Sequence, residues 1–297
     1  MFKLERIAIV GVGLIGGSVA LALKRAGVVG EVIGVGRNVA SLAEAKSLNV
    51  IDRACDLAEA ATLADCILIA TPVGQMPALF AAIAPHLKAS AIVMDAGSTK
   101  QDVIAAARAG LGEKIAQFVP AHPIAGRETS GVAAADATLY EHKKVVLTPI
   151  AENAAETITK AKAIWCACGA NVQMMSAEAH DAIFAAVSHL PHMLAFALVD
   201  EFAGRPNAKT LFSFAASGFR DFTRIAGSHP EMWRDIALNN REALLAEMDL
   251  YIKKIAQFRE LIAQSDAAQI EAVMQRSSDA KANWLAGELE YFRDESV

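Results

Sequence analysis

The feature that most constrains the fold is a glycine pattern close to the start of the chain. Residues 7–10 form a short apolar run, and Gly11-x-Gly13-x-x-Gly16 follows it directly. A helical segment comes next, and a second strand is predicted at residues 32–35. In such a strand–turn–helix unit the glycines permit, in order, a tight turn, close approach of a pyrophosphate to the backbone, and close packing of helix on strand. The pattern therefore predicts a dinucleotide-binding α/β domain.

The end of the second strand bears on which dinucleotide is bound. An acidic residue that holds the ribose 2′-hydroxyl is expected about 20 residues after the first glycine, but Gly36 and Arg37 occupy that place. A guanidinium can pair with a 2′-phosphate instead, and such a charge-assisted bond contributes about 1.5–3 kcal/mol. We therefore expect NADP to be preferred and NAD to be accepted, with a solvated surface arginine as the alternative interpretation of Arg37. The expected cofactor-binding residues are Gly11, Gly13, Leu14, Ile15, Gly16, Gly36, Arg37, Thr71, Pro72 and Val73.

The first half continues with apolar strands that alternate with helical segments. Residues 65–73 and 90–100 each contain such a strand, and further strands are predicted up to about residue 176. This alternation indicates a parallel sheet covered on both faces, in which ligands bind at the carboxyl ends of the strands. Because Thr71, Ser98 and His122 each follow a predicted strand, we expect them on the cofactor side of the sheet.

The second half is predicted to be helical. A long apolar segment interrupted by Pro191 opens it. Ser228-His-Pro-Glu231 has the form of a capping box, and the apolar spacing after it predicts one helix of about nine turns. A last helix is expected from about Asp266.

Together these patterns predict an α/β Rossmann-like dinucleotide-binding domain over residues 1–175 and an all-helical substrate and dimerisation domain over residues 176–297. We expect a homodimer, because helices this long and apolar need partners, with a single helical core as the alternative. The formal charge of −5 and the absence of a basic stripe argue against nucleic acid as a partner. Residues 7–23 are at the short limit for a membrane span, so we expect a soluble, cytoplasmic protein without a membrane partner.

A polar loop stands out in this apolar chain. Residues 120–131, PAHPIAGRETSG, hold His122 between Pro120 and Pro123, which restrict the backbone on both sides of the ring. An imidazole with a pKa near ~6.5 is mostly neutral at pH 7 and accepts a proton, a role worth about 10²–10⁴-fold in rate. His122 is therefore a candidate general base, with a histidine that caps a strand end as the alternative.

Several residues of the helical half are candidates for substrate binding. Arg220 and Arg224 lie among phenylalanine and isoleucine, where a guanidinium must reach solvent or meet an anion, and Trp233 follows nearby. His189 and His192 flank a proline and fit either a core position or a cleft. They supply two potential metal ligands without a third, and the four cysteines lack a zinc spacing, so we expect no metal.

The assembled motifs resemble the prephenate/arogenate dehydrogenase family of tyrosine biosynthesis. The resemblance extends from the first strand to about Arg259 and rests on GVGLIGGS, ATPV, DAGSTK, HPIAGRETSG, SHLPHMLAFAL and GFRDFTRIAGSHPEMWRDI, in the order of the family. It implies oxidation of a 4-hydroxycyclohexadiene acid, with hydride passing from C4 to NAD(P) and a ring carboxylate leaving as carbon dioxide. It also implies that His122 is the general base, that Ser98 orients its ring beside the nicotinamide, and that Arg224 binds a substrate carboxylate. Of the two helical histidines, His189 is the better match for a substrate-side role.

Two residues depart from the family pattern. Arg127 and Glu128 follow His-Pro-x-Ala-Gly, where the family often has Thr or Ser. Arg127 would answer a carboxylate and Glu128 the ammonium of arogenate, or both are charges on the rim. The expected substrate-binding residues are Arg224, His189, Arg127, Glu128 and Trp233.

Two other functions stay open at this point. A β-hydroxyacid dehydrogenase uses a catalytic lysine in its second domain, and here Lys253 and Lys254 lie late in a helix without a glycine-rich entry. A non-catalytic dinucleotide-binding regulator would need none of His122, Ser98 and Arg224.

Overall fold

The computed structural model describes residues 2–127 and 129–291. The chain divides into two compact units, Met1–Leu244 and Leu245–Val297, and each is described by itself.

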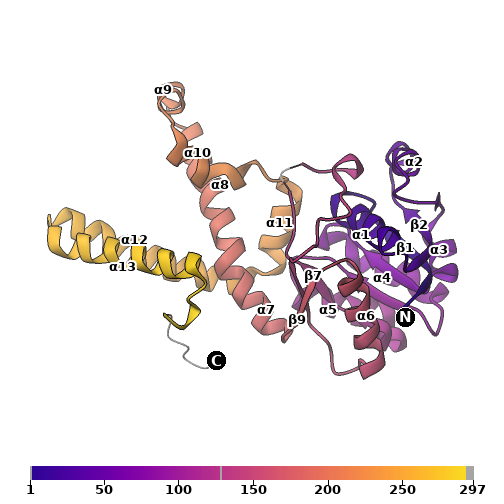
Figure 1. Ribbon diagram of the computed structural model, residues 1–297. Helices are drawn as coiled ribbons and strands as arrows, with labels where there is room; N and C mark the ends of the chain where they lie inside the picture. Colours follow the sequence, from indigo (N-terminus) through magenta and orange to yellow (C-terminus); the bar gives the residue numbers. More distant parts are fainter. Residues whose placement is uncertain (1, 128, 292–297) are drawn as a thin grey trace. The chain divides into compact units, whose positions relative to one another are not determined.

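A parallel sheet forms the centre of the first unit (Figure 1). Its order is β3-β2-β1-β4-β5-β6. β2 and β3 extend the sheet to one side of β1, and the chain then crosses back to place β4, β5 and β6 on the other side of β1. Such a switch point opens a crevice at the carboxyl ends of the strands. The strands are β1 (Leu4–Val10), β2 (Val29–Val35), β3 (Arg53–Ala54), β4 (Cys66–Ile69), β5 (Ile92–Asp95) and β6 (Phe118–Val119).

Helices cover both faces of this sheet, as its apolar strands require. Along β1, Ile7 and Ile9 belong to one buried cluster, whereas Ala8 and Val10 belong to the other, because successive side chains point to opposite faces. The first cluster includes residues of α1 and α6, and the second includes residues of α3, α4 and α5. The helices are α1 (Leu14–Arg25), α2 (Val39–Ser47), α3 (Leu57–Leu63), α4 (Met76–Ile83), α5 (Gln101–Leu111) and α6 (Ala155–Ala167). Short turns of 3-10 helix complete this part: η1 (Val73–Gln75), η2 (Ala84–His86), η3 (Gly112–Gln117) and η4 (Val132–Ala134). The predicted Rossmann-like fold is confirmed.

The last predicted strands form a second sheet instead of extending the first. β7 (Ala121–Pro123) pairs antiparallel with β8 (Lys144–Leu147), and β8 pairs parallel with β9 (Asn171–Met174). Pro120, which cannot donate to a ladder, separates β6 from β7. His122 therefore lies on a strand, opposite Val146, and the expectation of an irregular loop around it was wrong at this position.

The helical part of the first unit begins with a run that continues through Pro191. α7 (Ala177–Phe184) leads into a π turn, η5 (Ala185–His189), and then into α8 (Leu190–Ala203). The wider π turn accommodates a residue that lacks an N–H, so the predicted interruption is a local bulge. α9 (Ala208–Ser213), α10 (Ser217–Thr223), η6 (Arg224–Gly227) and α11 (Pro230–Asn239) follow.

By length and composition alone, the run Ala177–Ala203 is long and apolar enough to cross a membrane. The core helix of a soluble protein passes the same test. Here the run carries His180, Asp181 and His189, which are buried and hydrogen-bonded.

The predicted nine-turn helix is two helices. α11 ends at Asn239, α12 (Arg241–Ala263) begins two residues later, and the buried side chain of Asn240 between them bonds to the backbone of α7. The capping box does not form either: His229 is the N-cap of α11, and no side chain caps its first turn.

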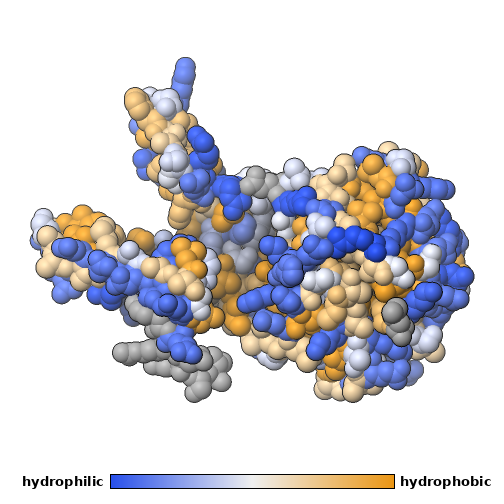
Figure 2. All heavy atoms as spheres, in the orientation of Figure 1, coloured by the Kyte–Doolittle hydropathy of each residue, from blue (hydrophilic) through white to orange (hydrophobic). Residues whose placement is uncertain are grey.

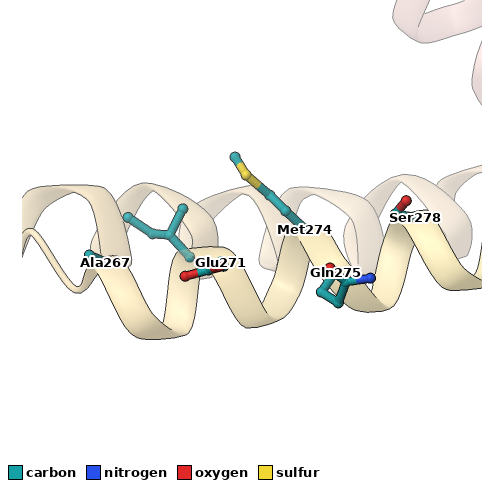
Figure 3. Close-up of a pocket in the computed structure, with 6 residues that line it drawn as sticks. Ala267, Glu271, Met274, Gln275 and Ser278 are labelled. Atoms are coloured by element: carbon teal, nitrogen blue, oxygen red, sulfur yellow. The ribbon is translucent and has the colours of Figure 1, made fainter.

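The second unit is a hairpin of α12 and α13 (Ala267–Ala286), followed by η7 (Leu289–Tyr291). Asp266 caps α13 by accepting a hydrogen bond from the Gln269 backbone at 3.1 Å. Figure 2 shows apolar surface along the hairpin. The exposed large hydrophobic residues of these helices include Leu250, Ile252, Ile255, Met274 and Leu285. A pocket on α13 is lined by Ala267, Ile270, Glu271, Met274, Gln275 and Ser278 (Figure 3) and lacks the grouped titratable residues of a catalytic site.

Candidate active site

The glycine turn between β1 and α1 has the shape of a pyrophosphate cradle. Gly11 has φ +95°, and a Cβ there would lie 2.6 Å from the Ala70 carbonyl oxygen. A Cβ on Gly16 would lie 2.4 Å from the Gly11 carbonyl oxygen, so the helix packs on its strand only with glycine at this position. At Gly13 a Cβ would meet nothing within 4 Å, and no side chain caps the helix that starts there. Open space in front of the free N–H groups of a helix fits an anionic group.

The residues after β2 leave room for the ribose end of a dinucleotide. Gly36 and Arg37 are exposed and follow the carboxyl end of the strand. A Cβ on Gly36 would meet Leu42 at an ordinary 3.6 Å. Within the described residues, no hydrogen bond or ion pair occupies the Arg37 guanidinium, so it is available for a phosphate.

The turn after β4 lies against the glycine turn. A Cβ on Gly11 would approach the Thr71 methyl group at 3.0 Å. The Thr71 hydroxyl is buried, and no described group pairs with it. Pro72 is the N-cap of η1, which begins with buried Val73. An unpaired buried hydroxyl at this edge fits a polar ligand beside the cradle.

His122 is held by a second histidine. Its Nδ1 lies 2.9 Å from Nε2 of His180, and the two rings meet edge to face. The Phe184 ring packs against both. Burial, followed by His180 and the positive charge of Lys100, lowers the pKa of His122 well below its usual value. The ring is therefore neutral at pH 7 and has the form that a general base requires.

The hydrogen-bond partner of His122 is a residue that the sequence did not single out. Ser98 follows β5 and is partly exposed, but no hydrogen bond joins it to His122 in the described structure. His180 lies on the Nδ1 side of the ring, and the orienting role expected for Ser98 stays a prediction. Ser98 remains a candidate for contact with the cofactor.

Asp181 anchors this pair of histidines. Its Oδ1 lies 2.8 Å from His180 Nδ1 and accepts a hydrogen bond from the Lys100 backbone, also at 2.8 Å. Its Oδ2 accepts one from the Gln101 backbone at 2.9 Å. Burial favours the neutral acid, but the hydrogen bonds from His180 and from the two backbone groups outweigh it and lower the pKa of Asp181.

A buried ion pair holds the strand that carries His122. Lys100 and Asp95 are fully buried and paired. Asp95 accepts a hydrogen bond from the Ala121 N–H at 2.9 Å, and Lys100 donates to the Ala121 carbonyl at 2.9 Å. Both polar groups of the residue before His122 are thus fixed by charged partners.

The predicted substrate-side residues of the helical part lie close together. His192 stacks on Trp233 with ring centroids 3.5 Å apart, and His189 meets the same indole edge to face at 6.1 Å. Burial lowers the pKa of His192, and the positive charge of Arg224 lowers it further. His189 in turn contributes to the lowered pKa of His122. Within the first unit, contacts therefore run from His122 through His180, Asp181, Asn240, His189 and Trp233 to His192, and Arg224 acts on His192 electrostatically.

His189 and His192 differ in exposure. His189 is buried, and Asn240 Nδ2 lies 3.1 Å from its Nδ1. Burial lowers the pKa of His189 to about 4. His192 is partly exposed and donates from Nδ1 to the Ser188 carbonyl at 2.8 Å. Among the described residues its other nitrogen has no hydrogen-bond partner, a property that the spacing around Pro191 did not reveal.

The two residues that depart from the family pattern have different outcomes. Arg127 is exposed and paired with Asp136. Asp136 donates from its backbone to the Ser18 hydroxyl at 2.9 Å, so this pair links the segment after β7 to α1. Glu128 lies outside the described residues.

The parallel sheet, the glycine cradle and a neutral histidine at the same edge define a dinucleotide-dependent dehydrogenase with a helical second part. Models of known families agree with this class. Residues 19–174 match the nucleotide-binding domain of prephenate dehydrogenase, and residues 176–276 match its dimerization domain.

Similar proteins point to the same family. The chain is 36% identical to a cyclohexadienyl dehydrogenase of Zymomonas mobilis over 95% of this chain and 96% of that protein. It resembles the structure of prephenate dehydrogenase from Aquifex aeolicus in complex with hydroxyphenyl propionate and NAD+, with a TM-score of 0.89, 35% identity and coverage of 95% and 99% of the two chains. For Synechocystis arogenate dehydrogenase the TM-score is 0.79 at 29% identity, with coverage of 94% and 100%. The chain belongs to the prephenate dehydrogenase family.

Proposed function

We propose that this protein oxidises prephenate, arogenate or both, with transfer of hydride to NAD(P) and loss of carbon dioxide. The observation that carries the proposal is the chain of contacts from a neutral His122 to His192, on which the charge of Arg224 acts, in a unit that also holds a dinucleotide cradle. A base and a cation on one side of a nicotinamide site match a substrate with a hydroxyl at one end and carboxylates at the other.

His122 accepts the proton of the C4 hydroxyl. The hydride leaves C4, the bond between the ring and its carboxylate breaks, and the released electron pair completes the aromatic ring. The proton held by His122 then returns to the phenolic oxygen. Bound NAD(P) supplies the hydride acceptor. The lowered pKa of His122 supports its role, because the ring is unprotonated when substrate arrives.

Arg224 binds a substrate carboxylate, and His192 assists it from the face of Trp233. We prefer His192 to His189 for contact with the side chain of the substrate, because His192 is partly exposed and its Nε2 has no hydrogen-bond partner among the described residues. The buried nitrogens His189 Nε2 and Trp233 Nε1 have no hydrogen-bond partner among the described residues. Substrate oxygens would satisfy both of them.

NADP is the preferred dinucleotide in this proposal. The support is the exposed guanidinium of Arg37, which pairs with no other side chain in the described part of the chain, and the absence of a carboxylate at position 36, which is Gly36. Gly11, Gly13 and Gly16, with Leu14 and Ile15 in the first turn of α1, hold the pyrophosphate.

The active form is a soluble, cytoplasmic homodimer that binds neither membrane nor nucleic acid. The dimerization domain of the family covers the helical part, and the α12–α13 hairpin carries many exposed apolar side chains that a second copy would bury. We retain residues 1–175 and 176–297 as functional domains, and the junction of the two family models at residue 175 supports this.

Turnover of prephenate and of arogenate, each with NAD and with NADP, tests the proposal. We expect carbon dioxide release and reduced dinucleotide in equal amounts with at least one substrate. Tight binding of NADP without turnover of either acid would contradict it and favour a regulator.

A further inference from the structure

The orientation of each ring in the histidine network determines which nitrogen carries a proton. Asp181 offers only acceptors: Oδ1 faces His180 Nδ1 at 2.8 Å, and the same carboxylate accepts the N–H groups of Lys100 and Gln101. A bare Nδ1 on His180 would place two lone pairs against each other at that distance. His180 therefore carries its proton on Nδ1 and leaves Nε2 as an acceptor.

The tautomer of His180 determines the tautomer of His122, the proposed base. His180 Nε2 lies 2.9 Å from His122 Nδ1, and an acceptor on His180 requires a donor on His122. In a neutral ring with a proton on Nδ1, Nε2 is free to accept. The second nitrogen of His122 is thus the one that receives the substrate proton, and Asp181 stabilises the resulting imidazolium through His180.

An amide sets the opposite arrangement in a neighbouring ring. Asn240 Nδ2 donates to the backbone carbonyl oxygen of Asp181 at 2.8 Å and lies 3.1 Å from His189 Nδ1. The amide nitrogen has two protons and no acceptor capacity, so His189 Nδ1 accepts and its Nε2 carries the proton. That buried donor has no partner among the described residues, so a ligand oxygen is its natural acceptor.

We propose that His180 and Asp181 are positioning residues that hold His122 with a free Nε2, and that Asn240 holds His189 in the opposite tautomer. The network then presents one acceptor and one donor for oxygen atoms of the substrate. This inference rests on the proposed function of His122 as the base, but the tautomers themselves are measurable without turnover.

The first experiment is a ring-nitrogen NMR spectrum of the full-length protein labelled with ¹⁵N-histidine, with and without NADP. His122, assigned by loss of its signals in His122→Asn, is expected to show a protonated Nδ1 and an unprotonated Nε2 at pH 7.5, and His189 the reverse. A protonated Nε2 on His122 would overturn the proposal.

The second experiment reverses the network with Asp181→Asn. The amide oxygen can cap α5, which leaves the amide nitrogen to donate to His180 Nδ1. His180 then donates to His122, whose Nε2 becomes protonated. We expect kcat to fall on the order of 10²–10⁴-fold, the range for loss of a general base. NADP affinity and KM should stay within about threefold of the wild-type values. A packing defect would change both quantities as well as kcat, so their constancy distinguishes the two causes.

The internal control is His192, whose Nδ1 donates to the Ser188 carbonyl outside this network. Its ring signals should not change in Asp181→Asn, whereas those of His122 should reverse. Unchanged His122 signals, or an unchanged kcat, would refute the inference. If Asp181→Asn does not fold, the wild-type spectrum decides alone. The expected tautomers without turnover of either acid would refute the proposed function and leave this inference standing.

Discussion

The cofactor preference can be tested at one exposed backbone position. Gly36→Asp restores the carboxylate that a ribose 2′-hydroxyl needs, and the change fits because a Cβ there meets Leu42 at 3.6 Å, an ordinary contact. A new charge-assisted hydrogen bond to NAD contributes about 1.5–3 kcal/mol, and loss of the Arg37 pairing removes a similar amount from NADP. The ratio of kcat/KM for NADP to that for NAD should therefore fall by roughly 10²- to 10⁴-fold.

The assay is initial-rate formation of reduced dinucleotide with saturating substrate and varied cofactor. Arg37→Ala should lower the ratio by about ten- to a hundredfold, because only the attractive half of the effect is removed. Arg108→Ala is the matched control: this arginine is also exposed, but it lies in the last turn of α5 and pairs with Glu152. An unchanged ratio in Gly36→Asp, at an unchanged melting temperature, would refute the reasoning about the ribose site.

Three further predictions concern the base, the anion site and pH. His122→Asn should lower kcat by about 10²–10⁴-fold with little change in KM, since asparagine cannot accept the hydroxyl proton; a KM change of that size with normal kcat would remove His122 from the role of base. Arg224→Ala should raise KM for the acid by about tenfold or more while NADP affinity, measured by fluorescence titration, stays constant; an unaffected KM would count against its assignment. Burial lowers the pKa of His189 to about 4, so the folded state binds fewer protons than the unfolded state between about pH 6.5 and pH 4. The contribution of His189 to stability is therefore fully present above this window. As the pH falls through it, urea unfolding should show a decrease in the free energy of unfolding on the order of 3 kcal/mol from His189 alone. This decrease should be smaller in His189→Gln.

The local features of this protein were predictable from its sequence. The cradle follows from three glycines between a strand and a helix, and the structure accounts for each one: φ +95° at Gly11, open space at Gly13 and contact with the Gly11 carbonyl at Gly16. The parallel sheet follows from apolar strands that alternate with helices, because both of its faces must be covered. These properties arise from backbone sterics and hydrophobic periodicity within a few tens of residues, which a sequence displays directly.

The residues that surround His122, the proposed base, could be identified only from the tertiary structure. His180 contacts His122 across 58 positions, Asp181 contacts Lys100 across 81, and Asn240 contacts Asp181 across 59. Adjacent His180 and Asp181 on an apolar helix have no pattern that predicts these partners, and Ser98 was the expected partner of the base in their place. Only the packing of α7 against α5 and β7 brings a carboxylate, two imidazoles and a helix N-terminus together, because hydrogen-bond geometry depends on positions in space that periodicity does not encode.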